Sequence, residues 1–292
     1  MQRVLFGDNQ FFGINHFSEE KARQQAIKFQ DIEAILDILQ SALQSGVSDF
    51  MCTTHDTVGQ IAAEVRSNPE KWEGFTFHPG MPYAHKYANA VTELGYLGAL
   101  KKFIPSGGMV DTLTRGARAV VAKDLESVMS MLIDAEMKMF EGLETPVIFL
   151  QNVVTDLILG LGAIDVFASF EAYIKRRYNA EAGFFTMNLP KLLEALHAAG
   201  VRKPIVCANV NKAGFRMSGG IEAYRDATNK YPARVIAMSV FASGGIPPRE
   251  AIEWVVGEPY VESIVFGASS CRNIESSVAL ITEADRQLGR AA

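Results

Sequence analysis

The sequence predicts a single-domain (β/α)8 barrel over residues 1–292, and three observations support this. Short apolar segments of strand length alternate with amphipathic segments of helical periodicity along the whole chain. Eight strand-like segments occur, which is the number that closes a parallel barrel. The last two are each followed by a turn containing glycine and serine and then by a helix, as in barrels whose final two loops bind an anion.

The expected strands are short and rich in Val, Ile and Phe, which is typical of parallel strands buried on both faces. They are expected at residues 3–6, 48–54, 74–78, 145–151, 183–188, 204–209, 234–241 and 262–266. Residues 7–30, after the first strand, are expected to form a long polar loop.

The helices are predicted from apolar periodicity and from residues that suit helix ends. Asp31 is placed to cap the first helix and Gly46 to end it. Between them, apolar residues recur at helical spacing: Ile32, Ile35, Leu36, Leu39 and Leu43. Further helices are expected at residues 58–67, 167–179, 189–200 and 220–230, and one after each of the last two strands.

The crossover between the third and fourth strands, residues 79–144, is far longer than one helix requires. Three helices are expected in it, at residues 83–103, 109–121 and 124–141, with Asp124 capping the third. The segment is rich in methionine, which suits an extra packed layer, a lid over the barrel mouth or an adaptable subunit interface. From the apolar content of residues 96–140 we expect a homo-oligomer.

Composition excludes several classes of partner and compartment. A hydrophobic fraction of 48% supports a sizeable core, and a net charge of -5 without a basic cluster argues against nucleic acid or a membrane surface as partner. The three cysteines have neither metal-ligand spacing nor the density of a disulfide framework. No signal peptide and no run of about 18 apolar residues is found. We therefore expect a cytoplasmic protein.

Histidines at the expected strand ends are the main candidates for acid/base chemistry. His55 and His78 are expected to face each other across the mouth, because imidazole titrates near neutral pH and both follow strands. Asp8 follows the first strand and is expected to orient one of them. The alternative for each histidine is a hydrogen-bonded core residue. A further possibility is a divalent metal held by a set of four residues: His55, His78, His85 and Asp8.

Amides dominate the remaining polar residues at strand ends, and neutral donors and acceptors suit a hydroxylated or carboxamide ligand. The predicted substrate-binding residues are Asn9, His16, His85, Gln151, Asn152, Asn188, Asn209, Asn211 and Lys212.

The two final loops are expected to bind a phosphate or another anion. Small residues let the backbone approach such a group, and the following helices direct positive dipole ends at it. The predicted residues are Ser243, Gly244, Gly245, Gly267, Ala268, Ser269, Ser270 and Arg272. Tight strand-to-helix turns without a ligand are the alternative explanation.

Residues 183–281 resemble the aldo-keto reductase family. The resemblance rests on "GFFTMNLPKLLEALHAAGVRKPIVCANVN", "VIAMSVFASGG" and "IVFGASSCRNIESSVALI". It implies a barrel, an NADP site at the last two loops and carbonyl reduction. The first half departs from the family pattern at four positions. Met51 stands where the family has an aspartate, and His55 or Asp56 stands near the position of its tyrosine. His78 stands where the family has a lysine, and Gln151 and Asn152 stand where it has a histidine.

These observations favour an intracellular enzyme that acts on a small polar metabolite, phosphorylated or carboxylated, by acid/base chemistry, as an isomerase, epimerase or lyase. The first alternative is an NADP-dependent oxidoreductase resembling the aldo-keto reductases, with His55 in place of the tyrosine. The second is a barrel that binds a ligand without catalysis.

Overall fold

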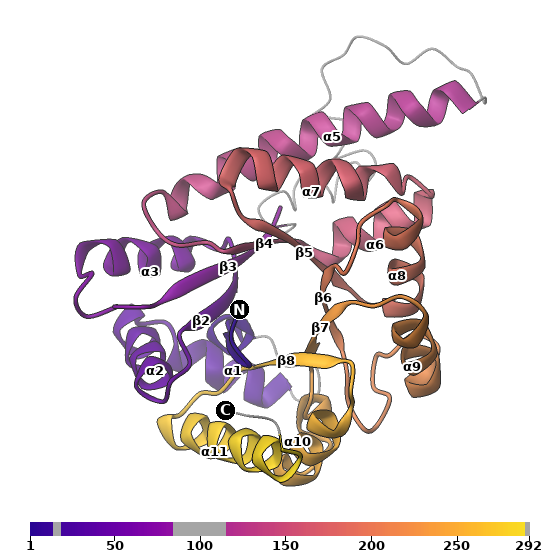
Figure 1. Ribbon diagram of the computed structural model, residues 1–292. Coiled ribbons are helices and arrows are strands. Elements are labelled where there is room, and N and C mark those ends of the chain that lie inside the picture. Colours follow the sequence, from indigo (N-terminus) through magenta and orange to yellow (C-terminus); the bar gives the residue numbers. More distant parts are fainter. Residues whose placement is uncertain (14–18, 84–114, 290–292) are drawn as a thin grey trace.

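The predicted fold is confirmed. The structure, a computed structural model, describes residues 1–13, 19–83 and 115–289, and its eight parallel strands form a closed barrel in sequence order (Figure 1). The strands are β1 (Val4–Gly7), β2 (Asp49–Thr53), β3 (Thr76–Met81), β4 (Val147–Leu150), β5 (Glu181–Thr186), β6 (Ile205–Asn209), β7 (Arg234–Met238) and β8 (Val261–Phe266). Their alternate residues face the barrel interior and the surrounding helices.

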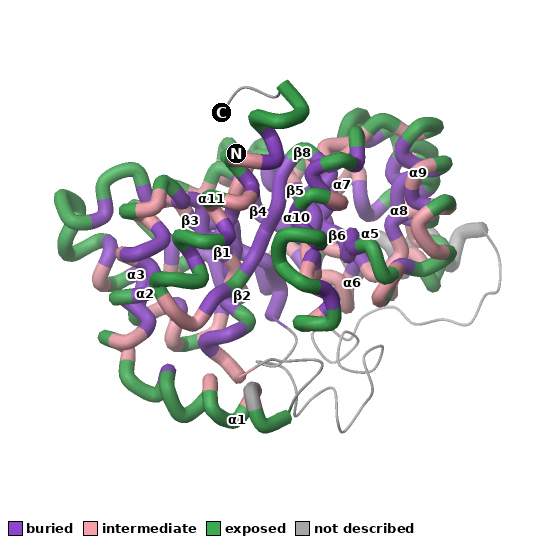
Figure 2. The backbone as a smooth tube through the Cα atoms, turned by 90° about the horizontal axis from the view of Figure 1, so that it is seen from below, coloured by how far each residue is buried: buried purple, intermediate pink, exposed green. Residues whose placement is uncertain are grey.

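Helices surround the barrel on the outside (Figure 1). The α-helices are α1 (Glu19–Lys28), α2 (Ile32–Gln44), α3 (Asp56–Ser67), α5 (Arg115–Met137), α6 (Asn152–Leu161), α7 (Asp165–Tyr178), α8 (Leu189–Ala198), α9 (Gly220–Lys230), α10 (Pro248–Gly257) and α11 (Cys271–Gln287). Short 3-10 helices are η1 (Asn9–Phe12), η3 (Lys138–Phe140) and η4 (Ala242–Gly244). Both termini lie at one end of the barrel, and α1 lies at the other end, the mouth (Figure 2).

Several helix ends form as the sequence predicts. The side chain of Asp31 accepts a hydrogen bond of 3.2 Å from the N–H of Glu33 at the start of α2. Ile35 and Leu39 on the predicted apolar face of that helix are fully buried. A capping side chain satisfies an N–H group that the first turn leaves unpaired, and the apolar face then packs against the barrel.

Three parts of the sequence-based helix assignment are wrong. Residues 7–30 are not a loop throughout, because they contain η1 and α1, and α6 was not predicted. Residue 124, predicted to begin a helix, lies instead within α5, which is one continuous helix from residue 115. The helix expected at residues 83–103 and the start of the next one fall outside the described residues.

The described part of the long crossover packs into the core. Met129, Ile133, Met137 and Phe140 are buried, whereas Met131 on the same helix is 50% exposed. Helix α5 lies along α7, joined by the hydrogen bonds of Tyr173 and Tyr178. Packing therefore accounts for most of the methionines that the structure describes here. The homo-oligomer stays a prediction.

Two aromatic rings pack together among the mainly aliphatic side chains inside the barrel. Phe149 on β4 and Phe185 on β5 stack with ring centroids 4.9 Å apart. A Cβ added to Gly183 would lie 2.3 Å from the Phe149 ring, and one added to Gly80 would lie 2.7 Å from the Phe185 ring. Each large side chain is thus accommodated by a glycine on another strand, the adjacent β5 for Phe149 and β3, two strands away, for Phe185. This gives the interdigitated packing of a closed barrel.

The strand β3 continues beyond the residue at which the sequence predicted its end. Pro79 and Gly80 resemble strand breakers, but both stay paired with β2, opposite Cys52 and Thr53. His78 is therefore the third of the six residues in the strand. It lies toward the end of the barrel opposite the mouth.

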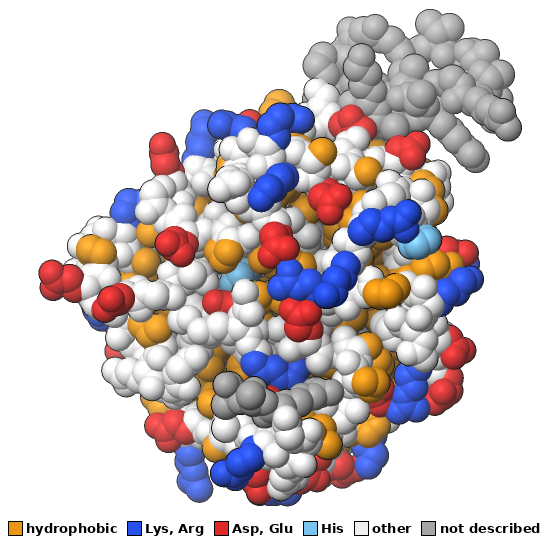
Figure 3. Space-filling view, viewed as in Figure 1, with side chains coloured by type: hydrophobic (Ala, Val, Ile, Leu, Met, Phe, Trp, Pro, Cys, Tyr) orange, Lys and Arg blue, Asp and Glu red, His pale blue; other side chains and the backbone are white. Residues whose placement is uncertain are grey.

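The surface on the side of the termini carries Lys and Arg interspersed with Asp and Glu (Figure 3). None of the helices in the described ranges is both long enough and apolar enough to cross a bilayer.

Candidate functional site

Asp8 and Thr53 join the ends of β1 and β2 at the barrel mouth. The Oδ2 atom of Asp8 accepts hydrogen bonds from the N–H of Thr53 at 2.6 Å and from its hydroxyl at 2.8 Å. Asp8 is only 6% exposed. Burial raises the pKa of its carboxyl to about 6, although the hydrogen bonds from Thr53 oppose the shift. A carboxyl that titrates this close to neutrality can exchange a proton under physiological conditions.

His55 follows β2 at the mouth, as predicted, and also caps a helix. Its Nδ1 atom accepts a hydrogen bond of 3.1 Å from the N–H of Thr57 at the start of α3. With Nδ1 accepting, the proton of the neutral ring is on Nε2. The imidazole packs 4.3 Å from the ring of Phe12 and 6.1 Å from that of Tyr83. Capping and an acid/base role are therefore compatible in one residue.

Tyr83 follows β3 and is held at the mouth by a buried carboxylate. Its backbone N–H lies 3.0 Å from both carboxylate oxygens of Glu136, a residue of α5 that is 3% exposed. The hydroxyl of Thr54 also donates to Glu136. Burial, followed by the charge of Asp8, raises the pKa of the Tyr83 phenol, so it keeps its proton at neutral pH.

The expectation that His78 faces His55 across the mouth is wrong. His78 is fully buried, with its Nε2 atom 3.2 Å from Asp49 and 3.4 Å from the Thr76 hydroxyl. Asp49 is the first residue of β2 and also accepts from the N–H of Gln2 at 2.7 Å. The contacts of His78 are thus those of a core residue, because β3 extends past it.

The predicted metal set is not assembled. His78 lies apart from Asp8 and His55, and His85 lies outside the described residues. Among the residues that the structure describes, no group of three or more His, Cys, Asp or Glu side chains could hold a metal ion.

Three of the six predicted substrate amides, Asn188, Asn209 and Asn211, form hydrogen bonds within the protein. Asn209 and Asn211 both donate to carbonyl oxygens of the loop that follows β6, those of Arg216 at 3.2 Å and Phe215 at 2.9 Å. Asn188 caps α8 by accepting from the N–H of Lys191 at 3.4 Å.

The other predicted substrate residues are dispersed. Gln151 precedes α6 and Asn152 begins it, while Lys212 forms an ion pair with Glu250 at 2.7 Å. Asn9 is the one predicted substrate-binding residue, among those that are described, that lines the large cavity beside the mouth. His16 lies outside the described residues.

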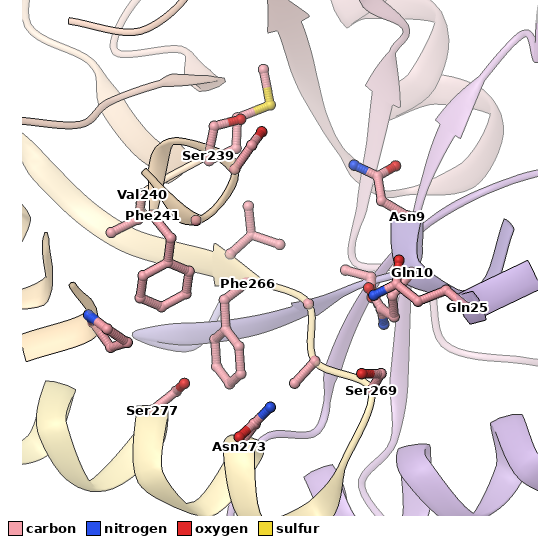
Figure 4. Close-up of a pocket in the computed structure, with 18 of the residues that line it drawn as sticks. Asn9, Gln10, Gln25, Ser239, Val240, Phe241, Phe266, Ser269, Asn273 and Ser277 are labelled. Atoms are coloured by element: carbon pink, nitrogen blue, oxygen red, sulfur yellow. The ribbon is translucent and has the colours of Figure 1, made fainter. Parts of the chain in front are cut away.

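A cavity of about 1050 Å³ opens beside the mouth, between the loops that follow β7 and β8 and helix α1. Figure 4 shows Asn9 and Ser239 on opposite sides of it, with Gln10 and Gln25 close together. Its inner end includes Gly7 and Asn9, the two residues that flank Asp8. Asp8 therefore adjoins the cavity, although Asp8, His55 and Tyr83 are not part of its lining.

Six of the predicted anion-binding residues line this cavity: Ser243, Gly244, Gly245, Gly267, Ala268 and Ser269. The other two do not line it. Ser270 caps α11 by accepting from the N–H of Asn273, and Arg272 is exposed to solvent. Gly267 is required sterically, because a Cβ there would lie 2.0 Å from Oε1 of Gln10.

The loop after β7 has an unusual backbone. Three residues that are not glycine adopt left-handed conformations: Ser239 at φ 56°, Ala242 at φ 46° and Ser243 at φ 58°. Such conformations cost on the order of 1–3 kcal/mol each and persist where the surrounding structure imposes them, often at functional sites. The sequence carries no sign of this strain.

Several residues of the site are absent from the predicted set, among them Lys28, Gln25, Tyr83 and Glu136. Lys28 and Gln25 lie on α1, in the segment that the sequence predicts to be a loop. Glu136 lies in a helix remote in sequence from the residues it binds. Tyr83 is the exception, since it follows a predicted strand closely enough to have been included.

No protein-family model matches the sequence, and no curated protein matches it. Solved structures match its fold. A protein described as an aldo-keto reductase from Pseudomonas aeruginosa gives a TM-score of 0.61 at 13% identity, over 97% of this chain and 91% of that one. A protein described as 2,5-diketo-D-gluconic acid reductase B gives 0.60 at 8%, over 99% and 88%.

A Bombyx mori aldo-keto reductase, solved in complex with NADP, gives a TM-score of 0.58 at 10% identity, over 98% of this chain and 89% of that one. The resemblance expected from the second half of the sequence thus extends over the whole fold. This chain is a (β/α)8 barrel with the fold of the aldo-keto reductases.

Proposed function

We propose that this protein is an oxidoreductase that binds NADP(H) and interconverts a carbonyl compound and its alcohol. The observation that carries the proposal is the cavity that runs from the last two barrel loops to the residues flanking Asp8. The matching solved structures are described as reductases, and one contains NADP. Both facts favour this function over an isomerase, epimerase or lyase.

The residues present suit a dinucleotide. The cavity volume of about 1050 Å³ lies at the upper end of the roughly 300–1,000 Å³ that holds drug-sized ligands. Gly244, Gly245 and Gly267 let a ligand approach the backbone. Oε1 of Gln25 is buried without a hydrogen-bond partner, so a donor group of a ligand would satisfy it.

When bound, NADPH supplies a hydride. The chain must then position the substrate oxygen and supply a proton. Asp8 is suited to hold and release that proton, because its pKa of about 6 lies close to neutrality. Tyr83 and His55 would orient the substrate oxygen by donating hydrogen bonds to it, since both rings lie at the mouth.

A cofactor-independent acid/base reaction is the second candidate function. It is favoured by the raised pKa of the Asp8 carboxyl and by the imidazole of His55 at the same end of the barrel, since either group could abstract a proton. The cavity would then hold a phosphorylated substrate.

Titration of the purified protein with NADPH, followed by fluorescence, tests the proposal. We expect micromolar binding and oxidation of bound NADPH by members of a panel of aldehydes and ketones. Absence of binding would reject the oxidoreductase and leave the second candidate. Binding without turnover of any carbonyl compound would favour a ligand-binding barrel.

A further inference from the structure

The charge of the cavity comes from one helix. Lys28 is the one charged side chain among the described residues that line the cavity, and no Asp or Glu is among them. This is notable in a chain with 33 acidic residues and a net charge of -5. The cavity is therefore suited to an anionic ligand, and the charge that would bind the anion is on α1.

Helix α1 is an addition to the β1–α2 connection and lies on the mouth side of the barrel (Figure 2). Most of its residues are exposed. It reaches the opposite wall of the cavity through Lys28, whose Nζ donates to the carbonyl oxygen of Ser269 in the loop after β8. An ammonium group has three donors, so this contact leaves capacity for a ligand at the same place.

The backbone of the loop after β7 contributes less than the sequence suggests. The N–H groups of Gly244 and Ile246 already donate to the carbonyl of Phe241, at 2.8 and 3.3 Å, and that of Gly245 donates to Ala242 at 3.1 Å. These amides are not available to an anion without rearrangement of the loop. The loop after β7 therefore offers an anion few free backbone donors, and a side-chain cation would supply attraction that these amides do not.

Gln25 supplies a second, independent indication. Like Gln24 and Lys28, it is a residue of α1 that lines the cavity. Its Oε1 atom is buried without a hydrogen-bond partner. An unpaired buried acceptor is costly, and a ligand O–H or N–H would remove that cost. The ligand thus carries a hydrogen-bond donor near its anionic group, as a nucleotide does with a ribose hydroxyl near a phosphate.

We infer that α1 carries the phosphate subsite of the cavity, in which Lys28 binds a phosphate group of a nucleotide and Gln25 accepts a hydrogen bond from the adjoining sugar or base. This inference rests on the proposed function for the identity of the nucleotide. The phosphate is either the one on the ribose of NADP or the diphosphate that NADP and NAD share.

Binding of NADPH and NADH to Lys28→Ala, Lys28→Arg and Arg272→Ala tests the subsite. We expect Lys28→Ala to weaken NADPH binding about 10- to 100-fold, the scale of a lost hydrogen bond to a charged group. Lys28→Arg keeps the cation and is expected to retain most of the affinity. Arg272→Ala is the matched control, because Arg272 is exposed and does not line the cavity.

The two nucleotides distinguish the two phosphates. A loss confined to NADPH assigns Lys28 to the ribose phosphate, and an equal loss for NADPH and NADH assigns it to the diphosphate. Wild-type affinity of Lys28→Ala for both would overturn the subsite while leaving the proposed function intact.

A measurement without nucleotide separates the subsite from the proposed function. Inorganic pyrophosphate is expected to raise the melting temperature of the wild type and of Arg272→Ala but not that of Lys28→Ala. If the wild type binds neither nucleotide yet shows this Lys28-dependent shift, the proposed function fails and the subsite stands. An equal rise in melting temperature with pyrophosphate in all three proteins would reject the subsite. The subsite is also rejected if pyrophosphate raises none of the three melting temperatures and nucleotide binding does not depend on Lys28.

Discussion

Asp8 and Thr53 form a two-point contact in which one carboxylate oxygen accepts from both the backbone N–H, at 2.6 Å, and the hydroxyl, at 2.8 Å. A similar contact occurs elsewhere at the strand ends, where Asp156 accepts from the Thr186 hydroxyl at 2.6 Å and from the N–H of Met187 at 3.0 Å. Burial raises the pKa of both carboxyls. The residues flanking Asp8 line the cavity, whereas Asp156 and its partners do not, so the two aspartates form a natural comparison.

Asp8→Asn is expected to lower the rate about 100-fold or more, because the amide cannot exchange a proton. Asp156→Asn, the control, is expected to change the rate little. In the wild type, the pH–rate profile should show a transition near pH 6, which Asp8→Asn removes. A profile in Asp8→Asn identical to that of the wild type would contradict the assignment.

The same substitution is expected to stabilise the protein at alkaline pH. The pKa of Asp8 is raised on folding from 3.8 to about 6, so its contribution to stability is present below pH 3.8 and lost as pH rises through 6. Asp8→Asn avoids the buried charge and should gain up to about 3 kcal/mol at pH 8. Denaturation in urea at pH 8 and pH 4 checks this, with the gain largely absent at pH 4.

His55 can be tested with two substitutions that differ in capping. His55→Ala removes the acceptor for the N–H of Thr57 and should cost about 1 kcal/mol of stability. His55→Asn restores a good capping side chain and should fold with nearly wild-type stability. Both should lose about 100-fold in rate if the imidazole orients or protonates the substrate. Full activity in His55→Asn would show that His55 is only a cap.

His78 is expected to affect stability and not chemistry. His78→Gln weakens the buried contact with Asp49 and should cost roughly 1–3 kcal/mol at pH 7. Although burial raises the pKa of Asp49, hydrogen bonds and the charge of His78 outweigh it and lower the pKa. This stability is present above pH 3.8 and lost as pH falls, so the deficit of the variant should shrink at pH 3. A kcat reduced tenfold in folded His78→Gln would contradict this role.

The ring packing in the barrel predicts opposite effects for two glycines. Gly183→Ala places a methyl group 2.3 Å from the Phe149 ring, which Phe185 holds from the other side, and should cost at least about 2 kcal/mol. Gly59→Ala in α3 meets nothing within 4 Å and should gain about 0.5–1 kcal/mol, because Ala favours the helix. Thermal unfolding of the two variants is the measurement. Equal melting temperatures would show that the barrel interior relaxes around the added methyl.

The candidate site was only partly predictable, and His78 shows why. The sequence predicts that the third strand ends at His78, because Pro79 and Gly80 resemble strand breakers. In the structure, however, β3 stays paired with β2 and β4 through Gly80. Asp8 and His55 were predicted correctly as residues at strand ends, since each directly follows a short apolar run. Whether such a residue faces the mouth depends on neighbouring strands that are distant in sequence.

The sequence by itself determined the number of strands, the parallel barrel and the cap of α2 at Asp31, because apolar periodicity and capping are local properties of a few neighbouring residues. Only the tertiary structure decided where β3 ends, which carboxyl is buried next to a threonine, and that α1 brings Lys28 and Gln25 to the cavity. These features depend on contacts between segments far apart along the chain, such as Lys28 with Ser269 and Glu136 with Tyr83. Their energy comes from burial and hydrogen bonds that exist only once the barrel has closed.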